Sequence, residues 1–197
     1  LEAQPDSIEE LAALTAIYRP GPLKANVHRK YVKAKRDADN IKYDHPIIEE
    51  ILGPTFGFIT FQEQFMLLAQ KLAGFDPGEA DKLRKTLVKK SLDTLHSKGS
   101  EKAIARDKFI KGAKELNGVP EEVSAKLWSE IEFFSVYGFN KSHAVAYAID
   151  SYYAAWLHTH HETDWLATIL QSENGNPAAM SKAISEIKSF GYEIAPA

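Results

Sequence analysis

The segment of residues 140–159 constrains the fold most, because its apolar side chains cover much of the circumference of a helix. A helix that is apolar nearly all round must be buried by other elements. Asn140 is a good N-cap for this helix, since its side chain can accept from free N–H groups of the first turn. We therefore expect a mostly α, multi-helix domain packed around this segment as its central helix, with one or two short strands at most.

The residues that start this helix form a tight turn whose chemistry suits an anion. Gly138 permits the turn, and Asn140, Lys141, Ser142 and His143 begin the helix. The first N–H groups of a helix have no intrahelical partner, and the helix dipole adds partial positive charge. With an ammonium, a hydroxyl and an imidazole beside them, these groups predict a phosphate-binding turn. An ordinary capped helix with a surface lysine is the alternative.

A second cationic stretch lies on a helix predicted to begin at Asp76 and Pro77. No acid is interleaved with its cations, although an exposed helix face normally carries Glu or Asp for pairing. An anionic partner such as phosphate would explain this, and a solvated helix face is the alternative. The five cations are Lys82, Arg84, Lys85, Lys89 and Lys90.

Three further polar groups leave alternatives open. Residues 24–36 carry six cations and no acid, which suits either a solvated face or contact with a nucleic-acid backbone. Gln62, Glu63 and Gln64 begin an otherwise apolar helix, where they hydrogen-bond to a ligand or cap the helix. The histidines near residue 160 match no zinc spacing, so we predict no metal site there.

Composition limits the class of protein. The 197 residues are 44% hydrophobic and 26% charged, as in soluble globular proteins. There is no membrane-length apolar run, no signal-peptide pattern and no cysteine, which suits a reducing cytoplasm. The net charge of −3 restricts any nucleic-acid contact to local patches. Because the sequence begins with Leu, we expect a piece of a longer chain.

Four motifs follow one another along the chain. They are Tyr18–Pro22, Thr55–Gly57 with Gln62–Gln64, Glu79–Lys85 with Lys89 and Lys90, and Tyr137–Ala144. Together they resemble the fingers region of the family C replicative DNA polymerases of bacteria, the alpha subunit of DNA polymerase III. The resemblance implies a fingers domain over residues 1–172. It implies that residues 173–197 are a linker and the start of a region that leads to a helix-hairpin-helix module.

The resemblance also implies roles for matched positions. Arg84 and Lys85 match a pair of arginines that reaches the triphosphate of the incoming deoxynucleoside triphosphate (dNTP). Lys141, Ser142 and His143 match a loop–helix junction that faces the same site. We add Lys89 and Asn140 to this phosphate-binding group. Candidate contacts to DNA or to the active site are Arg19, Gln62, Gln64, Lys82, Lys90 and Tyr137.

The parent protein would then catalyse template-directed DNA synthesis, for which two Mg²⁺ ions are held by palm carboxylates. The palm lies N-terminal to this segment in the family, so we expect no catalytic residue or metal here, and no activity of the segment alone. Expected partners are primer-template DNA, dNTP, the palm and other domains and, through those, the sliding clamp and replisome subunits. We expect no membrane contact and a location in the cytoplasm of a bacterium or a phage-infected host.

The sequence also departs from the family. Lys85-Thr86-Leu87-Val88 stands where a second arginine and a Met-Gly pair are usual, and lysine cannot make the two-pronged contact of arginine. Such differences indicate a divergent member, such as one from a phage. Two alternatives remain, namely a helical DNA-binding module without a nucleotide site and a structural domain that binds protein.

Overall fold

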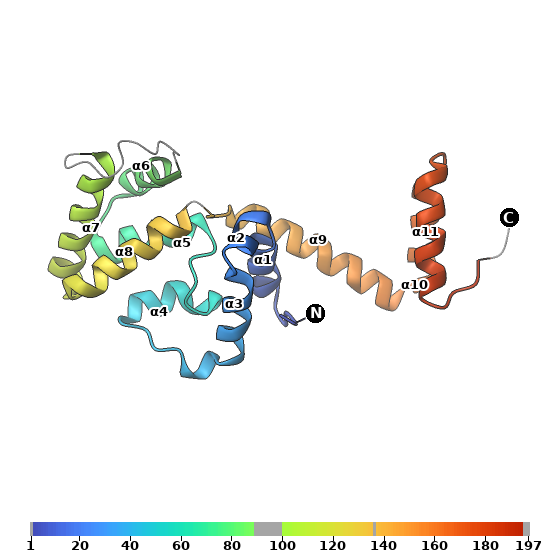
Figure 1. Cartoon of the computed structure of the whole chain (residues 1–197), viewed down its shortest axis with the longest axis horizontal. Helices are drawn as coiled ribbons and strands as arrows, with labels where there is room; N and C mark the ends of the chain where they lie inside the picture. Colours follow the sequence, from blue (N-terminus) through green and yellow to red (C-terminus); the bar gives the residue numbers. More distant parts are fainter. Residues whose placement is uncertain (1, 89–99, 136, 195–197) are drawn as a thin grey trace. The chain divides into compact units, whose positions relative to one another are not determined.

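The computed structural model describes residues 2–88, 100–135 and 137–194, and helices make up nearly all of its regular structure (Figure 1). The predicted mostly α class is confirmed. The one or two short strands allowed for by the sequence are reduced, within the described residues, to one parallel bridge between Phe61 and Phe139. The helices are α1 Ile8–Ile17, α2 Pro20–Lys24, α3 Val27–Arg36, η1 Ala38–Asn40, α4 Pro46–Leu52, η2 Gly53–Thr55, α5 Gln62–Ala73, α6 Pro77–Val88, α7 Glu101–Asn117, α8 Glu121–Ser135, α9 Lys141–His160, α10 Glu162–Ser172 and α11 Pro177–Ser189.

Capping residues fix where several helices begin. The Ser7 hydroxyl accepts from the Glu10 N–H at 3.2 Å at the start of α1. Asp76 and Glu79 each accept from the backbone N–H of the other, at 2.8 and 2.9 Å, before α6. Such side chains satisfy N–H groups that the helix itself leaves free. The start of α6 agrees with the one predicted from the sequence.

The chain divides into two compact units, Leu1–Ala148 and Ile149–Ala197. Within the second unit α10 packs against α11, and Ala183 and Ile187 are buried. The first unit contains two hydrophobic clusters. The α5 cluster joins α4, α5, α6, α7 and α8 and includes Phe65, Leu72, Phe109, Trp128 and Ile131. The α1 cluster joins α1, α3 and the start of α9 and includes Ala12, Ala13, Ala16, Tyr31 and Ala144.

Helix α5, not α9, holds the central place in the first unit. Six of its twelve residues are buried, and it packs against α4, α6, α7 and α8. Gly112 of α7 allows a close contact with α5, because a Cβ there would lie 2.1 Å from the Ala73 carbonyl oxygen. An alanine at this position would force the two helices apart.

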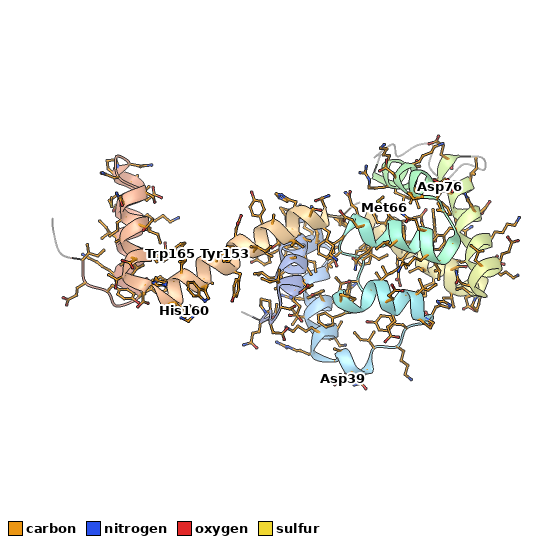
Figure 2. The ribbon with its side chains drawn as sticks, turned by 180° about the vertical axis from the view of Figure 1, so that it is seen from behind. Asp39, Met66, Asp76, Tyr153, His160 and Trp165 are labelled. Carbon is orange, nitrogen blue, oxygen red and sulfur yellow. The ribbon has the colours of Figure 1, made fainter. Side chains whose placement is uncertain are left out.

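The prediction that residues 140–159 form a central, buried helix is wrong. Of the twenty residues of α9, only Ala144 and Ala148 are buried. Tyr152, Tyr153 and Trp156 are exposed, by 49%, 60% and 41%. Figure 2 draws the side chains of this helix and labels Tyr153 among them. Apolar residues on every face of a helix indicate that something should cover it, but they do not say that the covering residues lie in the same segment.

None of the helices in the described part of the chain combines the length and the apolar character needed to cross a membrane.

Candidate phosphate-binding site

The turn from Tyr137 to Asn140 is fastened to the α1–α2 corner by Arg19. The guanidinium donates to the Tyr137 carbonyl oxygen at 2.5 Å and to the Ala16 carbonyl oxygen at 2.8 Å. It also lies 4.6 Å from the centre of the Phe139 ring, an arrangement that favours a cation. Burial lowers the pKa of Arg19, but arginine remains charged. Arg19 therefore holds the turn in place.

Two glycines let the turn approach its neighbours closely. A Cβ on Gly21 would lie 2.7 Å from the Tyr137 ring, and one on Gly138 would lie 3.1 Å from Cγ of Gln62. Gly138 does not have a positive φ angle. It is needed for close packing against α5 and not, as the sequence suggested, for an unusual backbone conformation.

The first residue of α5 joins the turn to α6. The Gln62 N–H donates to the Phe139 carbonyl oxygen at 2.9 Å, and its side-chain amide donates to the Gly138 carbonyl oxygen at 3.2 Å. The Gln62 amide oxygen is 3.5 Å from Nη1 of Arg84. One glutamine thus bridges two of the predicted groups, the α6 cations and the turn before α9.

The cations of α6 have acidic partners that the sequence analysis did not assign to them. Asp81 accepts from Arg84 at 2.8 Å and pairs with Lys85 at 2.7 Å. Lys82 pairs with Glu101 of α7 at 3.4 Å. Hydrogen bonds, first from Lys85 and then from Arg84, lower the pKa of Asp81. No acid is interleaved among these cations, but the inference that they lack acidic partners is wrong. Asp81 lies just before the stretch, and Glu101 lies on the next helix.

Lys89 and Lys90 lie outside the described residues, so their predicted roles stay predictions.

A carboxylate of the protein itself lies at the start of α9. Glu63 accepts from the Lys141 N–H with both oxygens, at 3.0 and 3.1 Å, and from the Asn140 side-chain amide at 3.2 Å. The predicted cap is present too, since Asn140 accepts from the His143 N–H at 2.8 Å. The sequence analysis named Glu63 among the polar residues that begin α5 but did not pair it with Lys141. A contact over 78 residues leaves no periodic signal, although an acid between two glutamines at a helix start was visible.

The side chains of Lys141, Ser142 and His143 are exposed around this turn. The Lys141 ammonium lies 5.9 Å from the Phe61 ring centre. In the described part of the chain, no carboxylate lies within ion-pair distance of it. The His143 ring packs between Phe139 and Tyr147, at 5.4 and 4.4 Å. The turn therefore presents an unpaired cation that can bind an anion.

Gln64 is placed in the core and away from any ligand. Its amide oxygen accepts from the N–H groups of Thr60 and Phe61, at 2.8 and 3.0 Å. Its amide nitrogen donates to the Thr55 hydroxyl at 2.7 Å and to the Ile51 carbonyl oxygen at 3.2 Å. Of the two glutamines proposed as contacts, Gln62 lies at the site, whereas Gln64 caps α5 and fastens the preceding loop.

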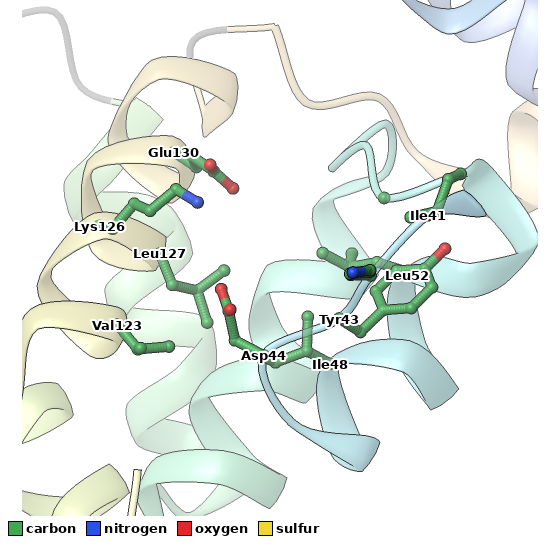
Figure 3. A pocket seen from close by; sticks show the side chains of 11 residues that line it. Ile41, Tyr43, Asp44, Ile48, Leu52, Val123, Lys126, Leu127 and Glu130 are labelled. Atoms are coloured by element: carbon green, nitrogen blue, oxygen red, sulfur yellow. The ribbon is translucent and has the colours of Figure 1, made fainter. Parts of the chain in front are cut away.

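The first unit has one pocket beside the turn at the start of α9 and another away from it. One, of about 170 Å³, has Phe61, Glu63 and Lys141 among its lining residues and so adjoins the turn. The other, of about 150 Å³, lies between the loop at residues 41–44, α4 and α8 (Figure 3). Asp44 and Glu130 line this second pocket, which contains none of the predicted phosphate ligands.

No three His, Cys, Asp or Glu side chains converge to hold a metal ion within the described ranges. His160 and His161 instead pack their rings near Trp156, at 4.7 and 5.5 Å.

The fold and the turn define a helical domain that presents cations beside a capped helix start. Comparison with known proteins gives its family. The model of the bacterial DNA polymerase III alpha subunit finger domain matches residues 1–117. The chain therefore belongs to the family of the bacterial DNA polymerase III alpha subunit finger domain.

Several curated relatives carry the name DNA polymerase III subunit alpha. The protein of Aquifex aeolicus is 43% identical over 193 residues, that of Vibrio cholerae is 38% identical over 198, and that of Escherichia coli is 36% identical over 198. Each match covers 98% of this chain and 16% of the relative. The chain thus spans about one sixth of the length of these relatives.

Proposed function

We propose that this chain is the fingers segment of a DNA-directed DNA polymerase and that it binds the triphosphate of the incoming dNTP over the template. The family supports the polymerase. The bridge that Gln62 makes between Arg84 and the carbonyl of Gly138 carries the nucleotide proposal. It connects a guanidinium on one helix with the cationic start of another, as a ligand with several negative charges requires.

Each cation in the proposed group contributes differently. Arg84 uses Nε and Nη2 on Asp81, and its Nη1 makes only the long contact with Gln62. Nη1 is therefore the donor most readily turned to a phosphate. Lys141 offers a point charge that no carboxylate of the described residues pairs, and Lys85 shares Asp81 with Arg84. Ser142, His143, Asn140 and Lys89 complete the proposed group.

Phosphoryl transfer depends mainly on positioning and on neutralising the charge that develops on the phosphates. The cations proposed here would do this at the triphosphate tail. The two Mg²⁺ ions that activate the primer 3′-hydroxyl would be held by palm carboxylates elsewhere in the longer protein. The segment alone would be inactive. It would work in the cytoplasm of a bacterium or an infected host, with primer-template DNA and the replisome as partners.

The test uses a full-length polymerase that contains this segment. Arg84→Ala and Lys141→Ala should each raise the KM for dNTP or lower kcat by roughly tenfold or more, the loss of one charge-assisted contact. Lys111→Ala is the control, because Lys111 is an exposed lysine of α7 whose carboxylate neighbour Glu115 is 3.8 Å away. Unchanged KM and kcat in both site variants would reject the nucleotide proposal.

A second candidate function is supported by α3. Arg29, Lys30 and Lys33 are exposed, and within the described ranges none of them has an ion-pair partner, whereas Lys35 is held by Glu10 and Asp6. This face suits the phosphates of a DNA backbone. Salt-dependent duplex binding that nucleotide does not change would favour such a DNA-binding module. Binding of neither ligand would favour a structural domain that binds protein.

A further inference from the structure

Glu63 occupies the position that an external anion would take at the start of α9. Both of its oxygens accept from the Lys141 N–H, and one also accepts from the Asn140 amide. A carboxylate is favourable there because the helix dipole and the free N–H groups attract negative charge. The protein therefore satisfies this helix end by itself.

The same contact leaves the side chain of Lys141 available. The carboxylate engages the lysine's backbone, while the ammonium lies over the Phe61 ring at 5.9 Å. An ammonium without a carboxylate partner is the stronger phosphate ligand, since no internal ion pair must be broken first. Arg84 differs, because it must share its guanidinium with Asp81.

Glu63 is held firmly enough to act as a reference point. The residue before it, Gln62, bonds to the turn through its backbone and its side chain. The residue after it, Gln64, is buried and makes four hydrogen bonds through its amide. Gln62 and Gln64 thus fix the backbone of Glu63, which lies between them.

We propose that Glu63 is a positioning residue for the triphosphate. By filling the N-terminus of α9, it prevents phosphate from binding to the backbone N–H groups and directs phosphate to the Lys141 ammonium. This inference rests on the proposed function and adds a residue that acts through Lys141. Removing the negative charge exposes a competing position a few ångströms from the correct one, where phosphate binds well but out of line for reaction.

The test measures inhibition of a full-length polymerase containing this segment by inorganic tripolyphosphate, a competitor of dNTP. In Glu63→Gln the inhibition constant should fall about threefold or more, because the α9 N-terminus is freed for an anion. At the same time kcat should fall about tenfold as the triphosphate is displaced. Tighter inhibition is informative, because a variant that merely loses structure cannot gain anion affinity.

Two companion variants control this experiment. Glu50→Gln removes a carboxylate that lines the same pocket but pairs with Lys71 at 2.5 Å, and it should leave the inhibition constant unchanged. Glu63→Asp keeps the charge and should restore part of kcat. In the Glu63→Gln background, Lys141→Ala should cost less than in the wild type, because the helix end then binds the phosphate.

The outcomes separate the two proposals. An unchanged or raised inhibition constant in Glu63→Gln, with Arg84→Ala and Lys141→Ala still impaired, would overturn the role of Glu63 and leave the nucleotide site in place. Normal kinetics of Arg84→Ala and Lys141→Ala would overturn both. A fall in the inhibition constant for Glu50→Gln as well would reduce the effect to general electrostatics and would also reject the role of Glu63.

Discussion

The two hydrophobic clusters of the first unit are held together in different ways. The α5 cluster is built from large side chains, and Phe65, Phe109 and Trp128 are at most 1% exposed. The α1 cluster relies more on alanines, which bury little area each, beside the large buried residues Ile17, Tyr31 and Phe61. Polar contacts supplement it, such as the pair of Lys35 and Glu10 at 2.5 Å.

This difference predicts which kind of substitution destabilises each cluster of the first unit most. Large, closely packed side chains make the α5 cluster respond to changes in volume. The α1 cluster, with less apolar area, depends more on hydrogen bonds and ion pairs. The candidate site lies where the clusters meet, on a turn fixed by Arg19, Gln62 and Glu63. Substitutions of polar residues should therefore change the geometry of the candidate site more than substitutions of apolar residues.

The largest expected effect is a volume change in the α5 cluster. Gly112→Ala should lower the free energy of unfolding by about 3 kcal/mol, because its Cβ would meet the backbone of α5 and neither helix can move cheaply. Thermal unfolding should show a fall in Tm of roughly 6–12 °C. Gly53→Ala is the control, since a Cβ there meets nothing within 4 Å. Equal Tm values for both variants would contradict the close packing of α5 and α7.

The next effect concerns the junction of the two clusters. Gln64→Leu preserves volume approximately but leaves the Thr60 and Phe61 N–H groups without an acceptor, at a cost of about 2 kcal/mol. Denaturant unfolding measures this loss. If the proposed function holds, the KM for dNTP should also rise in a full-length polymerase that contains this segment, because the start of α5 loosens. A stability like that of the wild type would mean that the buried amide is not needed.

A charge change in the α1 cluster should have a smaller effect. Glu10→Gln should cost about 1–2 kcal/mol, because the partly buried Lys35 then keeps only the Gln4 carbonyl oxygen and the exposed Asp6 as partners. Burial alone would lower the pKa of Lys35, but Glu10 and Asp6 together raise it. The pair therefore stabilises the fold below the ordinary lysine pKa and is lost as pH rises through the raised value. Glu10→Gln should flatten this alkaline loss, and an identical alkaline profile would exclude the pair as its cause.

The smallest effect tests a charge beside the α5 cluster. Burial raises the pKa of Glu130; Lys126 opposes this shift and Asp44 adds to it. The folded state then binds a proton more readily than the unfolded state, so stability falls as pH rises through the raised pKa. Glu130→Gln should be more stable than wild type at pH 7 by less than about 1 kcal/mol, and nearly equal at pH 4. Unfolding at the two pH values measures this, and a loss of stability at pH 7 would reverse the interpretation.

Local features of the fold could be predicted from the sequence, whereas long-range ones could not. Asp76 and Asn140 marked helix starts correctly, because a cap acts within three residues of itself. The burial of α9 could not be judged, since its apolar faces show that cover is needed without identifying the cover.

The candidate site shows the same limit. Arg84, Gln62 and the turn before α9 were chosen from separate motifs, and the structure brings them together. Their role in binding dNTP stays a prediction. The sequence did not identify Asp81 as a partner of the α6 cations or Glu63 as a partner of Lys141, and the reasons differ. Asp81 was left out of the stretch that it neutralises, and Glu63 meets Lys141 only through folding.

The fastening of the turn by Arg19 has a consequence for synthesis of the protein. Arg19 and Tyr137 are 118 residues apart, and Glu63 and Lys141 are 78 apart. On the ribosome, the earlier member of each pair emerges long before its partner and stays hydrated in the nascent chain. The turn can thus close only when nearly all of the first unit has left the exit tunnel, so a chain that stops before residue 137 would lack this region as a whole.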